Sequence, residues 1–197
     1  MSKQNLRESR RVKKQRNKMI TTLVWGGVAV AVVVLLGFMI WGAIRPAAGE
    51  SVPIMANFET HIPAGDNPGP FNSDPPTSGP HYAEEYDAGF YDESSPEAQV
   101  PYPEGYLGHN LEHGYVIYWY SCNLLNENEC VNLKDQIKAS MADNGGTKLI
   151  AFPRASIDVP VVITTWGQMQ RFEIFDADMA RKFVNANRNR APEPNAP

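Results

Sequence analysis

The histidines of this chain are confined to one part of the sequence. All four of them, His61, His81, His109 and His113, lie between residues 61 and 113. Imidazole nitrogens are favoured ligands of zinc, copper and nickel ions. His109 and His113 are four positions apart in the string "GHNLEHGYVIYWYSC", so a single turn of the chain can bring both rings together. A loop that delivers His81 to the same pocket would complete a site for copper or zinc.

Acidic and hydroxyl side chains near these histidines add further chemistry. We expect Glu112 and Asp87 to act as a further ligand or as hydrogen-bond acceptors behind the ligands, and His61 to contribute little. The alternative is a polar cluster that only satisfies backbone groups of a proline-rich loop, because a buried histidine can bond both a donor and an acceptor. Ser78 as a nucleophile beside a histidine base is a less specific alternative.

The string "HNLEH" also matches H-x-x-E-H, the inverted zinc-protease motif, in which two histidines bind zinc and the glutamate acts as a base. That motif requires a helix, so that both imidazoles share one face. Gly108 and Gly114 bracket the string, and an apolar run begins directly after it. The sequence therefore predicts a turn at the start of a strand and no protease site.

The chain has two cysteines, Cys122 and Cys130, separated by the seven residues "NLLNENE". This spacing differs from the C-x-x-C redox motif, and an exported domain would favour a structural disulfide that closes a short loop. A free pair and a thiolate metal site are the alternatives. Cys122 lies at the far end of the predicted strand from His113, about 30 Å away if the chain is extended, so we do not expect it to join the histidine site.

The N-terminal region has the pattern of a membrane anchor. Residues 1–18 contain eight basic residues and one acid, and residues 23–44 contain no charged side chain. A helix of that length spans about 33 Å, enough to cross a bilayer core of about 30 Å. The apolar segment is longer than the roughly 7 to 15 residues of a cleaved signal peptide. We expect a single-pass helix over residues 19–44 in the lipid bilayer of the cell membrane, with the N-terminus in the cytoplasm and the C-terminal domain outside.

Charge is distributed unevenly between the two parts of the chain. Residues 45–197 contain 10 basic and 21 acidic residues, a formal charge of −11. Such a surface does not suit binding to nucleic acid and can attract cations. The basic leader is explained by membrane orientation and by contact with anionic lipids.

The rest of the chain is predicted to form one exported domain over residues 57–190. Residues 45–56 are expected to form a flexible stalk and residues 191–197 a flexible tail. We do not expect helix in the proline-rich and glycine-rich stretch up to residue 106, but its aromatic residues predict an ordered wrap over a core. Beyond it we expect strands at "YVIYWY", "KLIAF", "VVITTW" and "MQRFEI", with a hairpin turning at Gly167 and Gln168.

Two helices are predicted among these strands. The first follows Asn132 as its cap, and the second follows Asp176, with Met179 and Phe183 facing inward. The fold class is therefore α+β, or small α/β, with a mixed sheet, two helices and the long wrap. The order of elements is similar to the C-terminal half of thioredoxin-like folds, in topology only, because the C-x-x-C motif is absent.

Several strings resemble one protein family. "PPTSGPHY", "GFYDE", "HNLEHGYVIYWY" and "ITTWG", with a final helix followed by "APE", look like the DUF3105 family of uncharacterised membrane-anchored bacterial proteins. The resemblance covers about residues 57–193. It implies a transmembrane segment, an exported domain and a shared motif that includes His81, His109 and His113, and it implies no reaction.

These observations predict a membrane-anchored extracytoplasmic domain that binds copper or zinc through its histidines. One alternative is a metal-dependent extracytoplasmic enzyme, a hydrolase or a redox enzyme. The other is a structural subunit that binds other membrane proteins. No nucleic-acid partner is expected.

Overall fold

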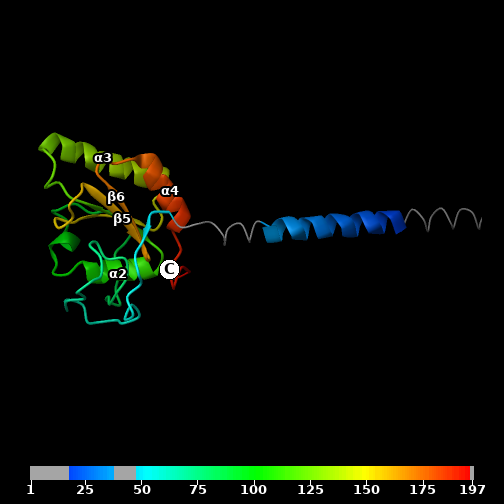
Figure 1. The fold of residues 1–197 in the computed structure, drawn as a ribbon, viewed down its shortest axis with the longest axis horizontal. Coiled ribbons are helices and arrows are strands. Elements are labelled where there is room, and N and C mark those ends of the chain that lie inside the picture. Colours follow the sequence, from blue (N-terminus) through cyan, green and yellow to red (C-terminus); the bar gives the residue numbers. More distant parts are fainter. Residues whose placement is uncertain (1–17, 38–47, 196–197) are drawn as a thin grey trace, which may run out of the picture. The chain divides into compact units, whose positions relative to one another are not determined.

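The computed structural model describes residues 18–37 and 48–195, and the chain divides into two units, Met1–Pro46 and Ala47–Pro197. In the first unit, residues Lys18–Gly37 form one helix, and an 18-residue window within it has a mean hydropathy of 2.4 (Figure 1). This helix is long and apolar enough to cross a membrane, although a signal sequence would meet the same criteria. The basic leader up to residue 17 and the end of the predicted span, residues 38–44, lie outside the described residues.

The second unit is built on a mixed sheet of six strands, which confirms the predicted α+β class. In sequence order the strands are β1 (Glu50–Ser51), β2 (Gly89–Phe90), β3 (Val116–Tyr120), β4 (Leu149–Pro153), β5 (Val161–Thr165) and β6 (Gln168–Phe172). Their order across the sheet is β1-β6-β5-β3-β4-β2. β3, β4 and β2 are parallel, whereas the pairs β3–β5, β5–β6 and β6–β1 are antiparallel.

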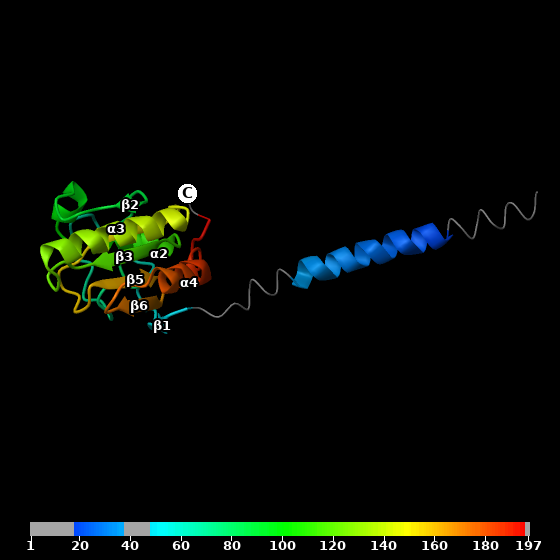
Figure 2. The same ribbon diagram turned by 90° about the horizontal axis from the view of Figure 1, so that it is seen from above.

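Helices cover both faces of this sheet, as Figures 1 and 2 show. The helices of this unit are the short 3₁₀ helix η1 (Pro96–Gln99), α2 (Glu104–Glu112), α3 (Glu127–Asp143) and α4 (Ala177–Asn187). α3 and α4 pack against the face that includes Tyr118 and Tyr120, and α2 packs against the face that includes Ile117 and Trp119. Because successive strand residues point to opposite faces, the fully buried β3 contributes to both cores.

The predicted helices exist, but two of their details were wrong. α3 begins at Glu127 rather than after Asn132, because Asn126 and Glu129 form a reciprocal capping box in which each side chain bonds the other residue's backbone N–H. In α4 the predicted cap is confirmed, since Asp176 Oδ1 accepts the N–H of Met179 at 2.9 Å. Met179 itself is 42% exposed, and the buried face of α4 is made by Ala180, Phe183, Val184 and Asn187.

The folded unit begins before the predicted boundary at residue 57. β1 pairs with β6, and the side-chain amide of Asn187 bonds both the N–H and the C=O of Ala48. Gly49 lies between these contacts with a φ of +89°, and an added Cβ would lie 2.5 Å from the carbonyl oxygen of Met169. Residues 48–51 therefore belong to the sheet edge rather than to a flexible stalk.

The β5–β6 hairpin turns at Trp166 and Gly167, one residue earlier than predicted. Gly167 adopts a φ of +65°, which a glycine accepts at no steric cost.

Candidate metal centre

The string "HNLEH" forms the end of helix α2, so the predicted turn was wrong. His109 is helical, His113 caps the helix, and the N–H of His113 donates to the carbonyl of His109 at 3.0 Å. Gly114, with a φ of +82°, lies immediately after the cap. This places two histidines four positions apart on one helical face, the arrangement that the zinc-protease motif requires.

Gly108, one of the two glycines that suggested a turn, is instead required by close packing, and so is Gly105. A Cβ on Gly105 would lie 2.3 Å from the ring of Tyr82, and a Cβ on Gly108 would lie 2.8 Å from the Cβ of His81. The loop that contains "SGPHY" therefore lies directly against α2. This contact brings His81 to the helix from 28 residues away in the sequence.

His109 and His113 face each other through their Nε2 atoms, which are 3.0 Å apart. The Nδ1 of His109 is 2.7 Å from the carbonyl oxygen of Tyr82. The Nδ1 of His113 is 2.9 Å from Oε2 of Glu85. Each Nδ1 atom faces an acceptor and therefore holds a proton, which leaves the Nε2 atom of each ring to face the other. Histidine ligands of metals are commonly held in this way, with the second ring nitrogen donating to a carbonyl or carboxylate.

His81 is fully buried and paired with Glu112. Its Nδ1 lies 3.0 Å from the carbonyl oxygen of Gly79, and its Nε2 lies 2.9 Å from Oε2 of Glu112. Burial lowers the pKa of His81, and the Gly79 carbonyl and the Glu112 carboxylate oppose this effect only in part. Glu112 is thus the hydrogen-bond partner of a neighbouring histidine.

The structure brings together two overlapping sets of candidate ligands. His61, His81 and His109 form one set, and Glu85, His109 and His113 form the other. Within each set the ligand atoms lie within 4.8 Å of one another. The rings of the three predicted histidines thus form a row. The ring centroids of His81 and His109 are 5.3 Å apart, and those of His109 and His113 are 4.3 Å apart.

Sequence reasoning missed Glu85, and it did not place His61 beside His81. The ring of His61 lies 4.6 Å from that of His81, because the two residues form a parallel β-bridge between loop segments. Nothing in the spacing of "HYAEEYD" distinguishes Glu85 from its neighbours. Asp87 belongs to neither set, and its backbone carbonyl accepts the hydroxyl of Tyr91.

Ser78, the alternative nucleophile, makes a structural contact. Its Oγ accepts the backbone N–H of Met55 at 3.1 Å, and the residue is 2% exposed. This bond ties the early segment of the domain to the "PPTSGPH" loop.

The C-terminal segment borders the site. The N–H of Glu193 donates to the carbonyl of Glu112, and Oε2 of Glu193 lies 3.7 Å from Nε2 of His113. Lys148 Nζ donates to the carbonyls of both His113 and Pro194. Figure 1 shows this end of the chain beside α2. Residues 191–195 therefore dock on the domain, whereas the last two residues of the predicted tail lie outside the described residues.

Comparison with known proteins identifies a family for this chain. No curated protein and no solved structure matches the chain. The family model described as "Protein of unknown function (DUF3105)" matches residues 66–197, a stretch that includes Glu85, His109 and His113. Because this match covers more than half of the sequence, the chain belongs to the DUF3105 family.

Proposed function

We propose that the folded domain binds one transition-metal ion, copper or zinc, through Nε2 of His109 and Nε2 of His113, with Glu85 completing the site. One observation carries the proposal, namely that these two nitrogens face each other at 3.0 Å while both Nδ1 atoms are already hydrogen-bonded. Two facing lone pairs need a proton or a cation between them. Nitrogen ligands at about 2.0–2.1 Å on a tetrahedral ion are separated by roughly 3.4 Å. A movement of a few tenths of an ångström would admit an ion.

The donor set favours copper or zinc. Imidazole nitrogens with a carboxylate oxygen suit these ions, and both thiols of the chain are engaged in a disulfide. The three residues differ in exposure, with His113 buried and Glu85 and His109 partly exposed, so an ion can reach the site from solvent. The formal charge of −11 on residues 45–197 adds a general attraction for cations.

A binding module is supported better than a hydrolase. In the inverted zinc-protease motif the glutamate acts as the base beside the metal. Here the corresponding residue, Glu112, is 4% exposed and bonds His81 instead. A metal-dependent enzyme, hydrolytic or redox, stays the alternative function, because two histidines and one carboxylate leave a coordination position open.

The place of this module in the cell is also part of the proposal. Helix Lys18–Gly37 has the length and hydropathy of a membrane span, and the basic residues before it favour a cytoplasmic N-terminus. We propose that residues 19–44 anchor the domain in the bilayer and that it acts outside the cytoplasm, beside other membrane proteins.

The competing account of the histidine pair needs no metal. A doubly protonated His113 would donate from Nδ1 to Glu85 and from Nε2 to His109, which satisfies every bond in the pair. Calorimetric titration of the full chain in detergent with Cu²⁺ and with Zn²⁺ separates the two accounts. One bound ion per chain is expected, and His109→Ala or His113→Ala should abolish binding. His61→Ala should weaken it much less.

Asp87→Asn provides a matched control, because it removes a nearby carboxylate that belongs to neither ligand set. It should leave affinity unchanged, whereas Glu85→Gln should reduce it. If the full chain binds neither ion, or binds it equally well without His109, the metal centre is refuted and the pair is a protonated hydrogen-bonded cluster.

A further inference from the structure

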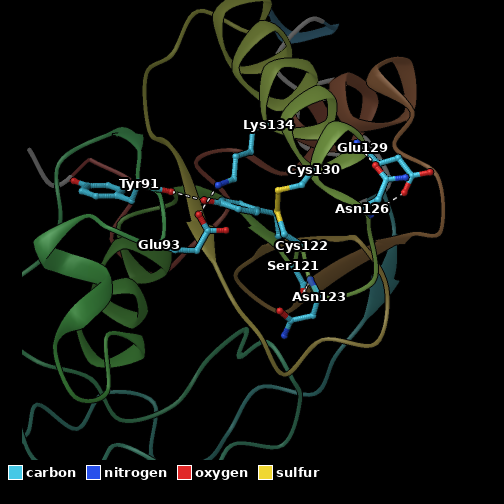
Figure 3. The surroundings of a disulfide bond; sticks show 10 residues. Tyr91, Glu93, Ser121, Cys122, Asn123, Asn126, Glu129, Cys130 and Lys134 are labelled. Atoms are coloured by element: carbon cyan, nitrogen blue, oxygen red, sulfur yellow. Dashed lines mark hydrogen bonds and ion pairs between the residues drawn. A yellow bond between two sulfur atoms is a disulfide. The ribbon is translucent and has the colours of Figure 1, made fainter.

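The disulfide lies at the opposite end of β3 from the histidine site. Cys122 follows Tyr120, the last residue of β3, by two positions, and Cys130 is in the first turn of α3. The bond between them, with Cα atoms 5.3 Å apart, therefore spans the crossing from strand to helix (Figure 3). In sheets with parallel strands, ligands bind outside the carboxyl ends of the strands. β3 and β4 are parallel and end at this place.

A hollow of about 280 Å³ opens beside the disulfide. Residues that follow β3 and β4 line it, among them Cys122, Asn123 and Arg154, together with Glu93 and Gln99 from the wrap. Neither cysteine is fully buried. A sulfur atom that borders an open hollow can be approached by another thiolate, which is the first requirement for thiol–disulfide exchange.

The elements on either side of the bond are held independently of it. β3 is paired with β4 on one side and with β5 on the other. α3 is fixed by its capping box and by burial of Leu133 and Ile137. If the disulfide opens, β3 and α3 therefore lose one covalent bond between them but keep their other contacts. A disulfide that cycles between oxidised and reduced states requires flanking elements that stay folded in both states.

The surroundings distinguish the two sulfur atoms. Cys130 lies in the first turn of a 17-residue helix, where the helix dipole stabilises a thiolate and makes it the better leaving group. Glu127 and Glu129 in the same turn oppose this effect, but the carboxylate of Glu129 is bonded to the backbone N–H of Asn126. A carboxylate oxygen of Glu93 lies within 4.8 Å of both sulfur atoms. The Glu93 carboxylate is also paired with Lys134, as Figure 3 shows.

Exposed apolar side chains flank the bond. Leu124, inside the loop, is 54% exposed, and Val131, next to Cys130, is 56% exposed. Acidic residues Glu93, Glu127 and Glu129 lie around the same position. Apolar contacts and negative charge together favour an apolar polypeptide segment over glutathione, which is an anion.

We propose that Cys122–Cys130 exchanges with a cysteine pair in an apolar segment of a partner polypeptide. A partner thiolate attacks Sγ of Cys122, a partner–Cys122 disulfide forms, and Cys130 leaves as a thiolate. The second partner thiolate then attacks its neighbour's sulfur in that mixed disulfide and releases Cys122 as a thiolate. The partner is oxidised to a disulfide by two electrons, the domain is reduced to a dithiol, and the two partner protons pass to the Cys122 and Cys130 thiolates. This activity is independent of the proposed metal site.

The test uses the full chain in detergent and a short synthetic peptide with two reduced cysteines between leucine and valine residues. After incubation, free thiols are blocked with a maleimide. The masses of the protein and of the peptide are then measured by intact-mass spectrometry. We expect reversible transfer of the disulfide to the peptide, with near-ultraviolet circular dichroism showing a folded, reduced domain. A matched peptide with glutamates in place of the apolar residues, and reduced glutathione, should each react several-fold more slowly.

A peptide with one cysteine tests the assigned roles of the two sulfur atoms. Such a peptide cannot complete the second step, so it should stop as a mixed disulfide with the domain, where maleimide blocks the released thiol. Digestion and fragment mass spectrometry should find this peptide on Cys122 several-fold more often than on Cys130. A disulfide that is reduced only when the domain unfolds, equal attachment of the peptide to both cysteines, or equal rates with glutathione would each overturn the proposal.

Discussion

Replacing Gly105 with alanine tests whether α2 owes its position to direct contact with the "SGPHY" loop. The new Cβ would lie 2.3 Å from two ring atoms of Tyr82, a fully buried side chain whose hydroxyl bonds the carbonyl of Asp66 at 2.7 Å. Ordinary contact begins at 3.4 Å, so the loop and the helix must separate by about 1 Å. The bond from His109 Nδ1 to the carbonyl of Tyr82, now 2.7 Å, would then be lengthened or broken.

The magnitude follows from three contributions. Overpacking of a core costs about 1–3 kcal/mol, and this clash with a rigid ring belongs at the upper end of that range. Loss of one hydrogen bond adds about 1 kcal/mol. Alanine gains back about 1 kcal/mol because it is a better helix former than glycine. The free energy of unfolding should therefore fall by about 3 kcal/mol, a decrease in Tm of roughly 6–12 °C for a domain of this size.

Thermal unfolding of the full chain, followed by near-ultraviolet circular dichroism, measures this effect. Gly89→Ala is the matched control, because nothing lies within 4 Å of an added Cβ there, and its Tm should stay within about 2 °C of wild type. Metal affinity should also fall in Gly105→Ala, since His109 loses the acceptor that orients it. A Gly105→Ala variant as stable as wild type would refute the close packing of loop on helix.

Three further predictions concern topology, the disulfide and pH. A reporter that works only outside the cytoplasm should be active when it is fused after Pro197. Activity of a reporter that works only in the cytoplasm, fused at the same position, would contradict the proposed orientation. Thiol labelling without reductant should find no free cysteine, and Cys122→Ala/Cys130→Ala should lower the free energy of unfolding by about 2–3 kcal/mol, as expected for a short closed loop. Burial lowers the pKa of His81 below its ordinary value of 6.5. On acidification the unfolded chain therefore takes up the proton before the folded chain does. The free energy of unfolding should be at its full value above about pH 6.5 and should fall below that pH. Denaturant unfolding at several pH values should show this slope, and His81→Gln should flatten it; an unchanged slope would assign the acid sensitivity to other groups.

Much of the fold could be predicted because it depends on local patterns. The apolar runs that form β3, β4 and β5 are buried on both faces, and a short run of β-branched and aromatic residues indicates such strands. The helix after Asp176 was predicted from its cap and its 3.6-residue period. Met179 was misplaced because an apolar residue at a plausible position can still lie on the exposed edge of a helix, 42% exposed in this case.

Two boundaries were predicted wrongly for different reasons. The first helix was predicted to follow Asn132, whereas the local capping box of Asn126 with Glu129 makes it start earlier, inside the loop closed by the cysteines. Glu50 and Ser51 look like a linker in sequence. They form a strand only because the exposed edge of β6 and the amide of Asn187 provide partners for their backbone.

The amino-acid types alone determined that a metal-ligand chemistry was available, because all four histidines lie within a short part of the chain and the cysteines lie apart from them. Only the tertiary structure decided how these residues are grouped. Tyr82 and His81 pack into the space left by Gly105 and Gly108, which places the carbonyl of Tyr82 against Nδ1 of His109 while Nε2 of that ring faces His113. Complementary packing between segments has no local signature, because each glycine by itself looks like a helix breaker and its partner is remote in sequence.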